Sequence, residues 1–307
     1  MSQRITTVKS YFSLVKFSHT IFAMPFAMIG FFLGITHLPV ESPSNVLQGW
    51  FLPGNGQYPY LISLFLVILC MVFARSAAMG FNRWLDKNFD AMNPRTALRE
   101  IPAGIISANR ALWFVVINCL AFIVCAGLIN QLCFYLSFVA LAVVLGYSYT
   151  KRFTPLCHLI LGLGLSLAPI GSYLAVTGQF AVLPVLFSFA VIFWVSGFDI
   201  IYALQDVDFD RSQRLHSIPV RLGKPRALRM SELLHLLSAV CVVVAGLYGE
   251  FHIWYWFGIA IFAGMLVYQH SIVKPNDLRR VNIAFMTANG IASVIFSVFV
   301  ITDLVIG

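Results

Sequence analysis

Charge is scarce in this chain of 307 residues, of which only 10% are Asp, Glu, Lys or Arg while 60% are hydrophobic. Soluble domains carry roughly a quarter charged residues, so the composition excludes an ordinary water-soluble fold. Apolar stretches of about 20 residues, the length that crosses a bilayer as a helix, recur along the sequence. We therefore expect a polytopic α-helical membrane protein, because a β-barrel would show shorter segments of alternating polarity.

Cysteine patterns that bind metals or build a disulfide framework are also missing. The six cysteines lie mostly inside apolar stretches, and they form neither a Cys-x-x-Cys pair nor a Cys/His cluster. We interpret them as small apolar packing residues. A cleavable leader is not evident either, because the first apolar stretch is long enough to span the membrane and follows three basic residues. We expect it to be the first span.

Nine apolar segments are long enough to be membrane-spanning helices. They are residues 17–37, 59–81, 109–130, 132–150, 156–177, 181–204, 232–249, 252–271 and 282–305. Soluble domains and low-complexity segments are absent between them. The sequence therefore predicts a single polytopic domain over residues 1–307.

Basic residues are missing from every second connection between these segments. All 20 Lys and Arg residues fall at the N-terminus, within 75–110, at 151–152, within 211–229 or within 274–280. Because basic loops stay in the cytoplasm, this asymmetry predicts a cytoplasmic N-terminus and an external C-terminus. It also accounts for the formal charge of +8, so we expect the lipid bilayer and not nucleic acid as the partner of these cations.

One polar stretch begins where the second apolar segment ends. Asn82, Asp86 and Asp90 are spaced four residues apart, so they share one helix face, and Arg75 lies two turns earlier on nearly the same line. A column of amide and carboxylate oxygens suits Mg²⁺, and neighbouring Arg and Lys residues suit a diphosphate. Taken alone, the spacing is more typical of solvated surface charges, and Arg75 suits either an ion pair or ligand contact.

A second acidic stretch follows the sixth apolar segment. Asp199 lies within that segment, and Asp206 and Asp210 follow two and three helical turns later. An ionisable residue at membrane depth is a functional-site candidate. Two acidic columns facing each other on the cytoplasmic side would hold two or three Mg²⁺ ions around a diphosphate. Beside an apolar tunnel, that arrangement suits the ionisation of an allylic diphosphate.

The combined motifs resemble the UbiA superfamily of intramembrane aromatic prenyltransferases. The resemblance is carried by Asn82-x₃-Asp86-x₃-Asp90, Arg95-Thr-Ala-x-Arg99-x-x-Pro102-x-Gly104, Tyr147-x₃-Lys151, and Asp206-x₃-Asp210 with Ser217-x-Pro-x-Arg221-x-Gly223. Within that superfamily, the segment from Lys16 to Ala27 also resembles the 4-hydroxybenzoate polyprenyltransferases and their relatives of menaquinone synthesis.

This resemblance implies a nine-helix bundle that transfers a polyprenyl group from polyprenyl diphosphate to a hydroxybenzoate-like acceptor and releases diphosphate. It implies quinone biosynthesis in a bacterial cytoplasmic (inner) membrane. The ligands of Mg²⁺ and diphosphate would be Asn82, Asp86, Asp90, Asp206 and Asp210. The further diphosphate contacts would be Lys151, Arg95 and Arg99. The floor of the site near the acceptor would be lined by Asp199 and Tyr147.

Alternatives remain open at this point. The acceptor could be a naphthoate or another hydroxylated aromatic compound. An ion-coupled transporter also carries internal repeats and buried carboxylates, but those carboxylates are expected near the membrane centre, and here only Asp199 is. A structural scaffold gives no reason for aspartates in register on two helices. The two acidic stretches lie four segments apart, which suggests two related halves (segments 1–4 and 5–8) with a ninth helix appended.

Overall fold

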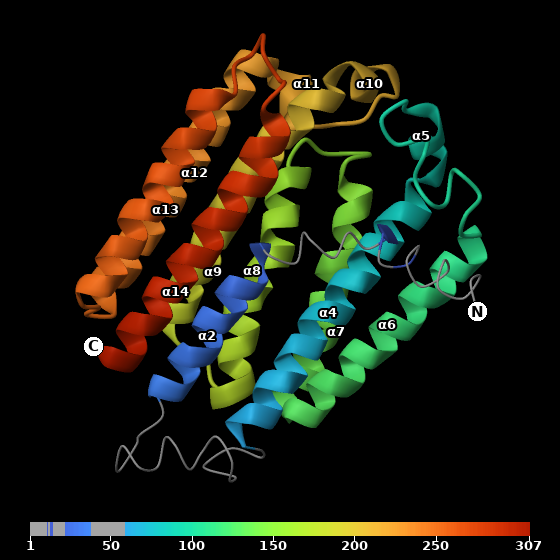
Figure 1. Cartoon of the computed structure of the whole chain (residues 1–307). Helices are drawn as coiled ribbons and strands as arrows, with labels where there is room; N and C mark the ends of the chain where they lie inside the picture. The colour runs from blue at the N-terminus through green and yellow to red at the C-terminus, as the bar shows by residue number, and fades with distance from the viewer. Residues whose placement is uncertain (1–10, 12, 15–21, 38–58) are drawn as a thin grey trace, which may run out of the picture.

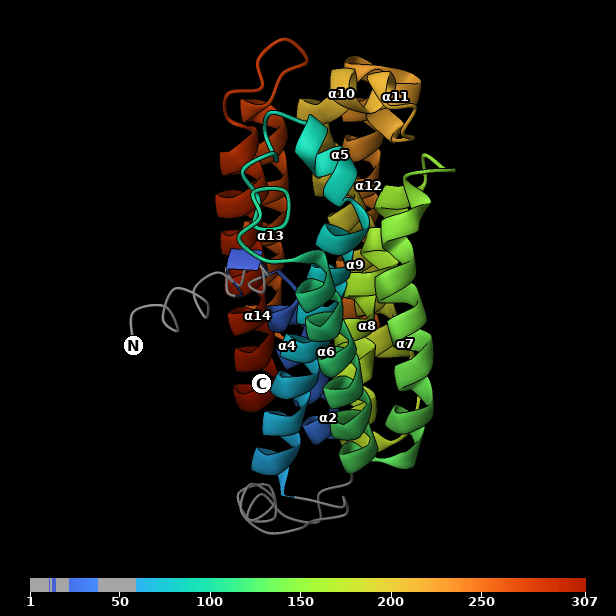
Figure 2. The same ribbon diagram turned by 90° about the vertical axis from the view of Figure 1, so that its right-hand side faces the viewer.

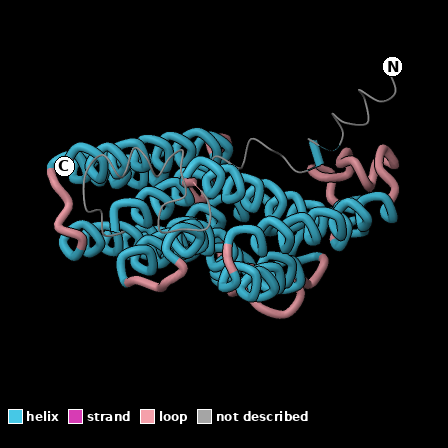
Figure 3. Tube along the Cα trace, turned by 90° about the horizontal axis from the view of Figure 1, so that it is seen from below, coloured by secondary structure: helices cyan, strands magenta, loops and turns pink. Residues whose placement is uncertain are grey.

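The computed structural model describes residues 11, 13–14, 22–37 and 59–307. Within these ranges the chain forms helices and loops, without a strand (Figure 3). This confirms the predicted all-α class. Residues 17–21 of the first predicted span, the first half (residues 16–21) of the N-terminal segment that resembles the superfamily, and the connection 38–58 lie outside the described residues.

The helices fall into two length classes. The long ones are α2 (Met24–His37), α4 (Tyr60–Leu85), α6 (Ala108–Ile129), α7 (Gln131–Thr150), α8 (Cys157–Thr177), α9 (Val182–Ala203), α12 (Lys224–Tyr248), α13 (Ile253–Ile272) and α14 (Asn289–Ile306). The short ones are α5 (Lys87–Met92), the 3₁₀ turn η2 (Leu204–Asp206), α10 (Val207–Ser212), α11 (Ile218–Leu222) and the π-helical turn η3 (Ile283–Ala288).

The long helices pack side by side, and the short helices α5, α10 and α11 gather at one end of the bundle (Figures 1 and 2). The C-terminus lies at the opposite end. Helix α8 packs against α2 on one side and α9 on another, while α9 also packs against α12, and α4 against α6. This packing brings the ends of α4, α7 and α9, which carry the polar motifs, to the same level.

Seven helical stretches are long and apolar enough to cross a bilayer. Helix α2 is apolar but shorter, with 14 residues. Helix α13 is not among the seven, because Trp254, Tyr255, Gln269 and His270 make it less apolar than the others. The polytopic helical membrane fold is therefore confirmed, whereas the count of nine spans and the sidedness of the termini stay predictions.

Apart from Arg75, which lies within α4, the described Lys and Arg residues fall in the connections and helix ends between α4 and α6, α7 and α8, α9 and α12, and α13 and α14. The turns at the opposite end, within 130–131, 178–181 and 249–252, contain none. The flanks expose large apolar side chains such as Trp113 and Val267, as lipid contact requires. This is the charge asymmetry on which the positive-inside rule depends.

The interior between α2, α9, α13 and α14 is filled by large aromatic side chains. Phe26, Trp194, Phe262 and Phe296 are fully buried and belong to one cluster. Helices α8 and α9 approach more closely than side chains would allow, because Gly162 of α8 faces the backbone of α9. The functional side chains of α8 and α9 are consequently held in a rigid pair of helices.

Candidate active site

The helix that carries the first acidic stretch is broken at Asp86, the middle residue of the column Asn82, Asp86 and Asp90. Helix α4 ends before Asp86, which has φ −93° and ψ 10° and caps the short helix α5. The predicted unbroken helix through this stretch is therefore corrected, because Asp86 lies in the bridge region of backbone conformations. The column nevertheless survives, since the N–H of Asp86 donates to Asn82 O at 2.9 Å and the N–H of Asp90 to Asp86 O at 2.8 Å.

The second acidic stretch is broken in the same way. Helix α9 ends at Ala203, the turn η2 follows, and Asp206 has φ −106° and ψ 7° before α10 begins. Each break is followed by a six-residue helix that carries one buried aspartate, Asp90 in α5 and Asp210 in α10. The two stretches thus share a local design: a long apolar helix, an aspartate at the break, and a second aspartate one turn later.

Each of these four aspartates forms an ion pair with one basic side chain. The nitrogen–oxygen distances are 3.0 Å for Arg152–Asp86, 2.7 Å for Arg99–Asp90, 2.6 Å for Arg95–Asp206 and 2.8 Å for Lys151–Asp210. Three of the pairs join different elements, because Lys151 and Arg152 follow α7 and Arg95 follows α5. The ends of α4, α5, α7 and α10 therefore converge on one polar site.

Arg95 connects the two acidic stretches directly. Its guanidinium donates to both carboxylate oxygens of Asp206, with Nε 2.9 Å from Oδ1 and Nη2 2.6 Å from Oδ2. Nη1 also donates to the Tyr202 hydroxyl at 3.2 Å, and the Asn93 amide donates to Asp206 Oδ1 at 3.3 Å. The loop after the first stretch thus reaches the second, and a bidentate contact of this kind fixes the geometry of both partners.

The charges at this end of the bundle act on one another. Burial raises the pKa of Asp86, and the guanidinium of Arg152 opposes that rise. Burial by itself lowers the pKa of Lys151, but the carboxylates of Asp210 and Asp206 outweigh it and raise that pKa above its ordinary value. Lys151 also acts on Asp86. Its ammonium group is therefore within the electrostatic reach of both acidic stretches.

Several buried oxygens of the site have spare capacity for a cation. In the described part of the chain, Oδ2 of Asp90 and both carboxylate oxygens of Asp210 are buried without a hydrogen bond of good geometry, although Lys151 Nζ lies 2.8 Å from Asp210 Oδ1. Buried carboxylate oxygens are costly unless they are paired or coordinate a metal. Amide and carboxylate oxygens are the ligands that Mg²⁺ prefers.

A preformed metal cage is not present in the described residues, since no three His, Cys, Asp or Glu side chains are close enough to hold an ion by themselves. This does not conflict with the donor set. Mg²⁺ is usually bound by one or two carboxylates together with waters and substrate phosphates. The residues therefore fit a metal ion that binds with a phosphate-bearing ligand.

Three predicted residues lie deeper in the bundle, below the ion pairs. The charged groups of Arg75, Asp86 and Asp199 all act on the Tyr147 hydroxyl, so these side chains face a common region. Arg75 Nε is buried without a hydrogen-bond partner among the described residues. Asp199 Oδ2 lies 2.6 Å from His158 Nδ1. Every residue proposed from the sequence thus lies at this end of the bundle or just beneath it.

Sequence reasoning missed four members of the site: Arg152, Asn93, Tyr202 and His158. Arg152 could have been proposed because it is adjacent to Lys151, but the positive-inside rule already accounted for a basic pair at the end of a membrane span. Asn93 lies three residues after Asp90 and could have been found as an extension of that polar stretch. His158 shares no spacing with Asp199, and their contact depends on how α8 packs against α9.

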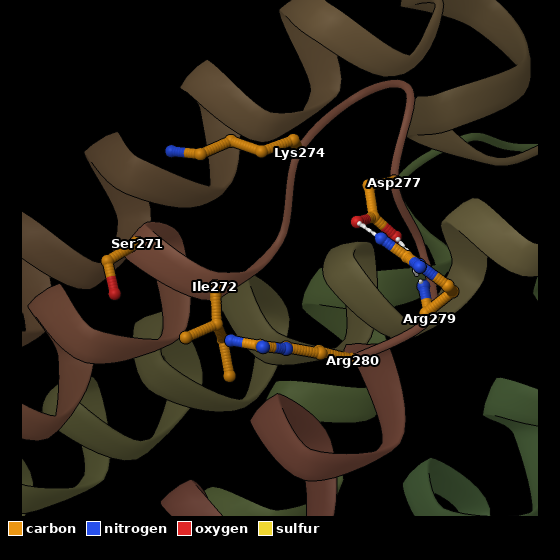
Figure 4. A pocket seen from close by; sticks show the side chains of 6 residues that line it. All are labelled: Ser271, Ile272, Lys274, Asp277, Arg279 and Arg280. Carbon is orange, nitrogen blue, oxygen red and sulfur yellow. Dashed lines mark hydrogen bonds and ion pairs between the residues drawn. The ribbon is translucent and has the colours of Figure 1, made fainter.

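A separate pocket of about 520 Å³ opens on the loop between α13 and α14 (Figure 4). It is lined by Ser271, Ile272, Lys274, Asp277, Arg279 and Arg280. Arg279 and Asp277 are paired at 2.6 Å. None of its residues belongs to the two acidic stretches, so this pocket is distinct from the site described above.

The fold is similar to those of solved UbiA homologues. An apo UbiA homologue from Aeropyrum pernix K1 has a TM-score of 0.73 and 27% identity, covering 94% of this chain and 97% of that one. A UbiA homologue from Archaeoglobus fulgidus bound to GPP and Mg²⁺ has a TM-score of 0.68 and 18% identity, covering 97% and 100%. The architecture is thus that of an intramembrane helical bundle of the UbiA type.

Sequence comparisons agree with the fold. The model of the UbiA prenyltransferase family matches residues 45–291. A 4-hydroxybenzoate octaprenyltransferase of Tolumonas auensis is 31% identical over 236 residues, which are 76% of this chain and 82% of that protein. One of Photobacterium profundum is 30% identical over 251 residues, 81% of this chain and 86% of that protein. The chain belongs to the UbiA prenyltransferase family, and its apolar helices and bacterial relatives make it a multi-pass protein of the inner membrane.

Proposed function

We propose that this chain transfers a polyprenyl group from polyprenyl diphosphate to a ring carbon of a hydroxybenzoate-like acceptor in quinone biosynthesis. The observation that carries the proposal is the set of four aspartate–base pairs that joins two broken helices at one end of an apolar bundle. Four carboxylates and four cations match the two halves of a magnesium diphosphate. Relatives named as 4-hydroxybenzoate octaprenyltransferases support the acceptor class.

The four paired aspartates, with Asn82 beside Asp86, would hold Mg²⁺. Bound Mg²⁺ neutralises the charge that develops on a leaving diphosphate. If these carboxylates held the metal, their basic partners would be available to the phosphate oxygens. Arg95 and Arg99 suit bidentate phosphate contacts, whereas Lys151 offers a compact point charge. The ion pairs therefore keep the site neutral until substrate binds, which limits the cost of burying eight charges.

The deeper residues suit the aromatic acceptor. Arg75 Nε is buried and has no hydrogen-bond partner in the described part of the chain, so this guanidinium is an appropriate contact for the acceptor carboxylate. During transfer, the C–O bond of the prenyl diphosphate breaks and its electron pair leaves with the diphosphate. A C–C bond forms to the ring, and the ring carbon loses its proton to a base, for which Asp199 is the candidate. The apolar surroundings exclude water from the reactive prenyl cation.

The purified protein in lipid nanodiscs tests this proposal directly. It is incubated with a polyprenyl diphosphate, Mg²⁺ and one acceptor at a time: 4-hydroxybenzoate, a hydroxynaphthoate, or benzoate as the control that lacks a hydroxyl. Mass spectrometry should find the acceptor carrying one prenyl group with 4-hydroxybenzoate, no product with benzoate, and no product after chelation with EDTA. Absence of a prenylated product with every hydroxylated acceptor would refute the proposed reaction, and product only with the naphthoate would correct the acceptor.

A further inference from the structure

His158 is a buried titratable residue that the reaction described above does not use. It lies in the first turn of α8, and its side chain is 3% exposed. Its Nδ1 lies 2.6 Å from Asp199 Oδ2, whereas the Asp199 side chain is 23% exposed. No described residue forms a hydrogen bond with Asp199 Oδ1. One carboxylate oxygen is thus held by the imidazole, and the other is free to contact a ligand.

The other ring nitrogen of His158 determines where the proton lies. The backbone N–H of Ile218, at the start of α11, points at Nε2 from 3.4 Å. A nitrogen that accepts a hydrogen bond carries no proton, so this contact places the ring proton on Nδ1, which donates to Asp199. An imidazolium would set two donors against each other at Ile218. The local structure therefore favours one tautomer in which His158 is a donor to the carboxylate.

The backbone around His158 is also fixed. Its carbonyl accepts a hydrogen bond from the Ser196 hydroxyl of α9 at 3.1 Å. Gly162, one turn further along α8, allows the two helices to approach, because a Cβ there would lie 2.5 Å from Ile192 O. The imidazole and the carboxylate are thus presented by two helices in direct contact. Their short hydrogen bond does not depend on a loop.

We infer that His158 is a positioning residue, which holds Asp199 Oδ2 and fixes the orientation of the carboxylate, so that Oδ1 faces the acceptor and takes the ring proton. This inference rests on the proposed function. A hydrogen bond to a carboxylate is short and directional, so it holds the carboxylate in one orientation.

Three variants separate positioning from a structural role. In His158→Leu the donor is lost and the volume is nearly kept, so we expect kcat to fall about 10- to 100-fold, as for hydrogen-bond partners that orient reactive groups. KM for the prenyl diphosphate should stay near the wild-type value. In His158→Gln an amide donor remains, so most of the lost rate should return. In an Asp199→Asn background, His158→Leu should produce no further fall, because the two residues act as one unit.

The matched control is His235→Leu. His235 is equally buried, in α12, and bonds His270 at 2.8 Å instead of an aspartate. This variant should keep wild-type kcat, and melting temperatures recorded for all variants identify any loss of folding. If His158→Leu proves unstable, His158→Gln still tests the inference. It should retain most of the wild-type kcat, and it should cause no further loss of kcat in the Asp199→Asn background.

Two kinds of failure are distinguishable. If the wild-type protein forms no prenylated product, the proposed function fails and takes the inference with it. If the wild-type protein is active, the inference alone is overturned by any of three results: wild-type kcat in His158→Leu, an equal loss of kcat in His158→Gln and His158→Leu, or the same fractional loss with and without the Asp199 carboxylate.

Discussion

Three influences meet at the carboxylate of Asp86. The Asn82 amide donates to Oδ2 at 3.2 Å, Arg152 donates to Oδ1 at 3.0 Å, and burial disfavours the charge. A buried carboxylate survives in its ionised form only with such partners. The sequence placed Asn82 and Asp86 in one column. Arg152, which follows α7, is 66 residues away from Asp86, and only the packing of the helices brings the two together.

The raised pKa of Asp86 predicts how the site responds to acid. Protons and Mg²⁺ compete for the same oxygens, and burial moves the protonation of Asp86 to a higher pH than that of an ordinary aspartate. The Mg²⁺ concentration that gives half-maximal diphosphate release should therefore rise as the pH falls from about 7 to about 5. Titrations with Mg²⁺ at a series of pH values measure this requirement. A requirement that is the same throughout this range would contradict the assignment.

The raised pKa of Asp86 also affects folding stability, and for stability a lower pH is favourable. A carboxyl group whose pKa is raised in the folded state binds its proton more tightly there than in the unfolded chain. Without metal, Asp86 therefore stabilises the fold less as the pH rises through the unfolded pKa toward the folded one. Bound Mg²⁺ removes this penalty by replacing the proton, so metal and substrate should raise the melting temperature most at neutral pH.

At the level of helices, apolar length predicted most boundaries. The segment predicted over 109–130 is α6 at Ala108–Ile129, and that over 132–150 is α7 at Gln131–Thr150. Helix α12 begins earlier than the predicted 232, at Lys224, because its first turns carry polar residues that hydropathy does not assign to a span. The helix breaks at Asp86 and Asp206 could not be predicted either. A four-residue spacing is the same in one continuous helix and in two successive helices.

The contact of α8 with α9 offers a test by a pair of glycines in one helix. Replacing Gly162 with Ala would put a Cβ 2.5 Å from Ile192 O, so the helices must separate. We expect a loss of about 1–3 kcal/mol of stability, as for overpacked cores. Gly171 is the control, because a Cβ there meets nothing within 4 Å and Ala favours helix. Thermal unfolding should show a lower midpoint for Gly162→Ala only, and equal midpoints would contradict the close packing.

The molecule as a whole has one polar end and one nearly uncharged end. The connections that carry most Lys and Arg residues include α5, α10 and α11. These short helices lie at one end of the bundle, and the C-terminus lies at the other (Figure 1). This distribution supports a site that opens to the cytoplasm, where the charged diphosphate group of the substrate is in contact with water. The similar breaks after α4 and α9 support two related halves within one domain over residues 1–307, which stays a prediction.

Reporter fusions test the sidedness of this arrangement. Alkaline phosphatase is active only outside the cytoplasm, so a fusion after Gly307 should be active and one at Asn276, in the basic loop between α13 and α14, should be inactive. Green fluorescent protein at the same two positions should give the reverse pattern. Equal activity of the two phosphatase fusions would contradict the predicted orientation of α14, and an inverted pattern would reverse the whole topology.

The account depends on two acidic stretches that grip one magnesium diphosphate, and the most direct measurement is the rate of Mg²⁺-dependent diphosphate release by three single variants. Asp86→Asn and Asp206→Asn each remove a charged oxygen from a different stretch, while Asp208→Asn alters an exposed aspartate of the same α10 segment. With folding verified by thermal unfolding, the first two should lose about 100-fold or more of the rate and the third should stay near wild type. Full turnover in Asp86→Asn or Asp206→Asn would contradict the account.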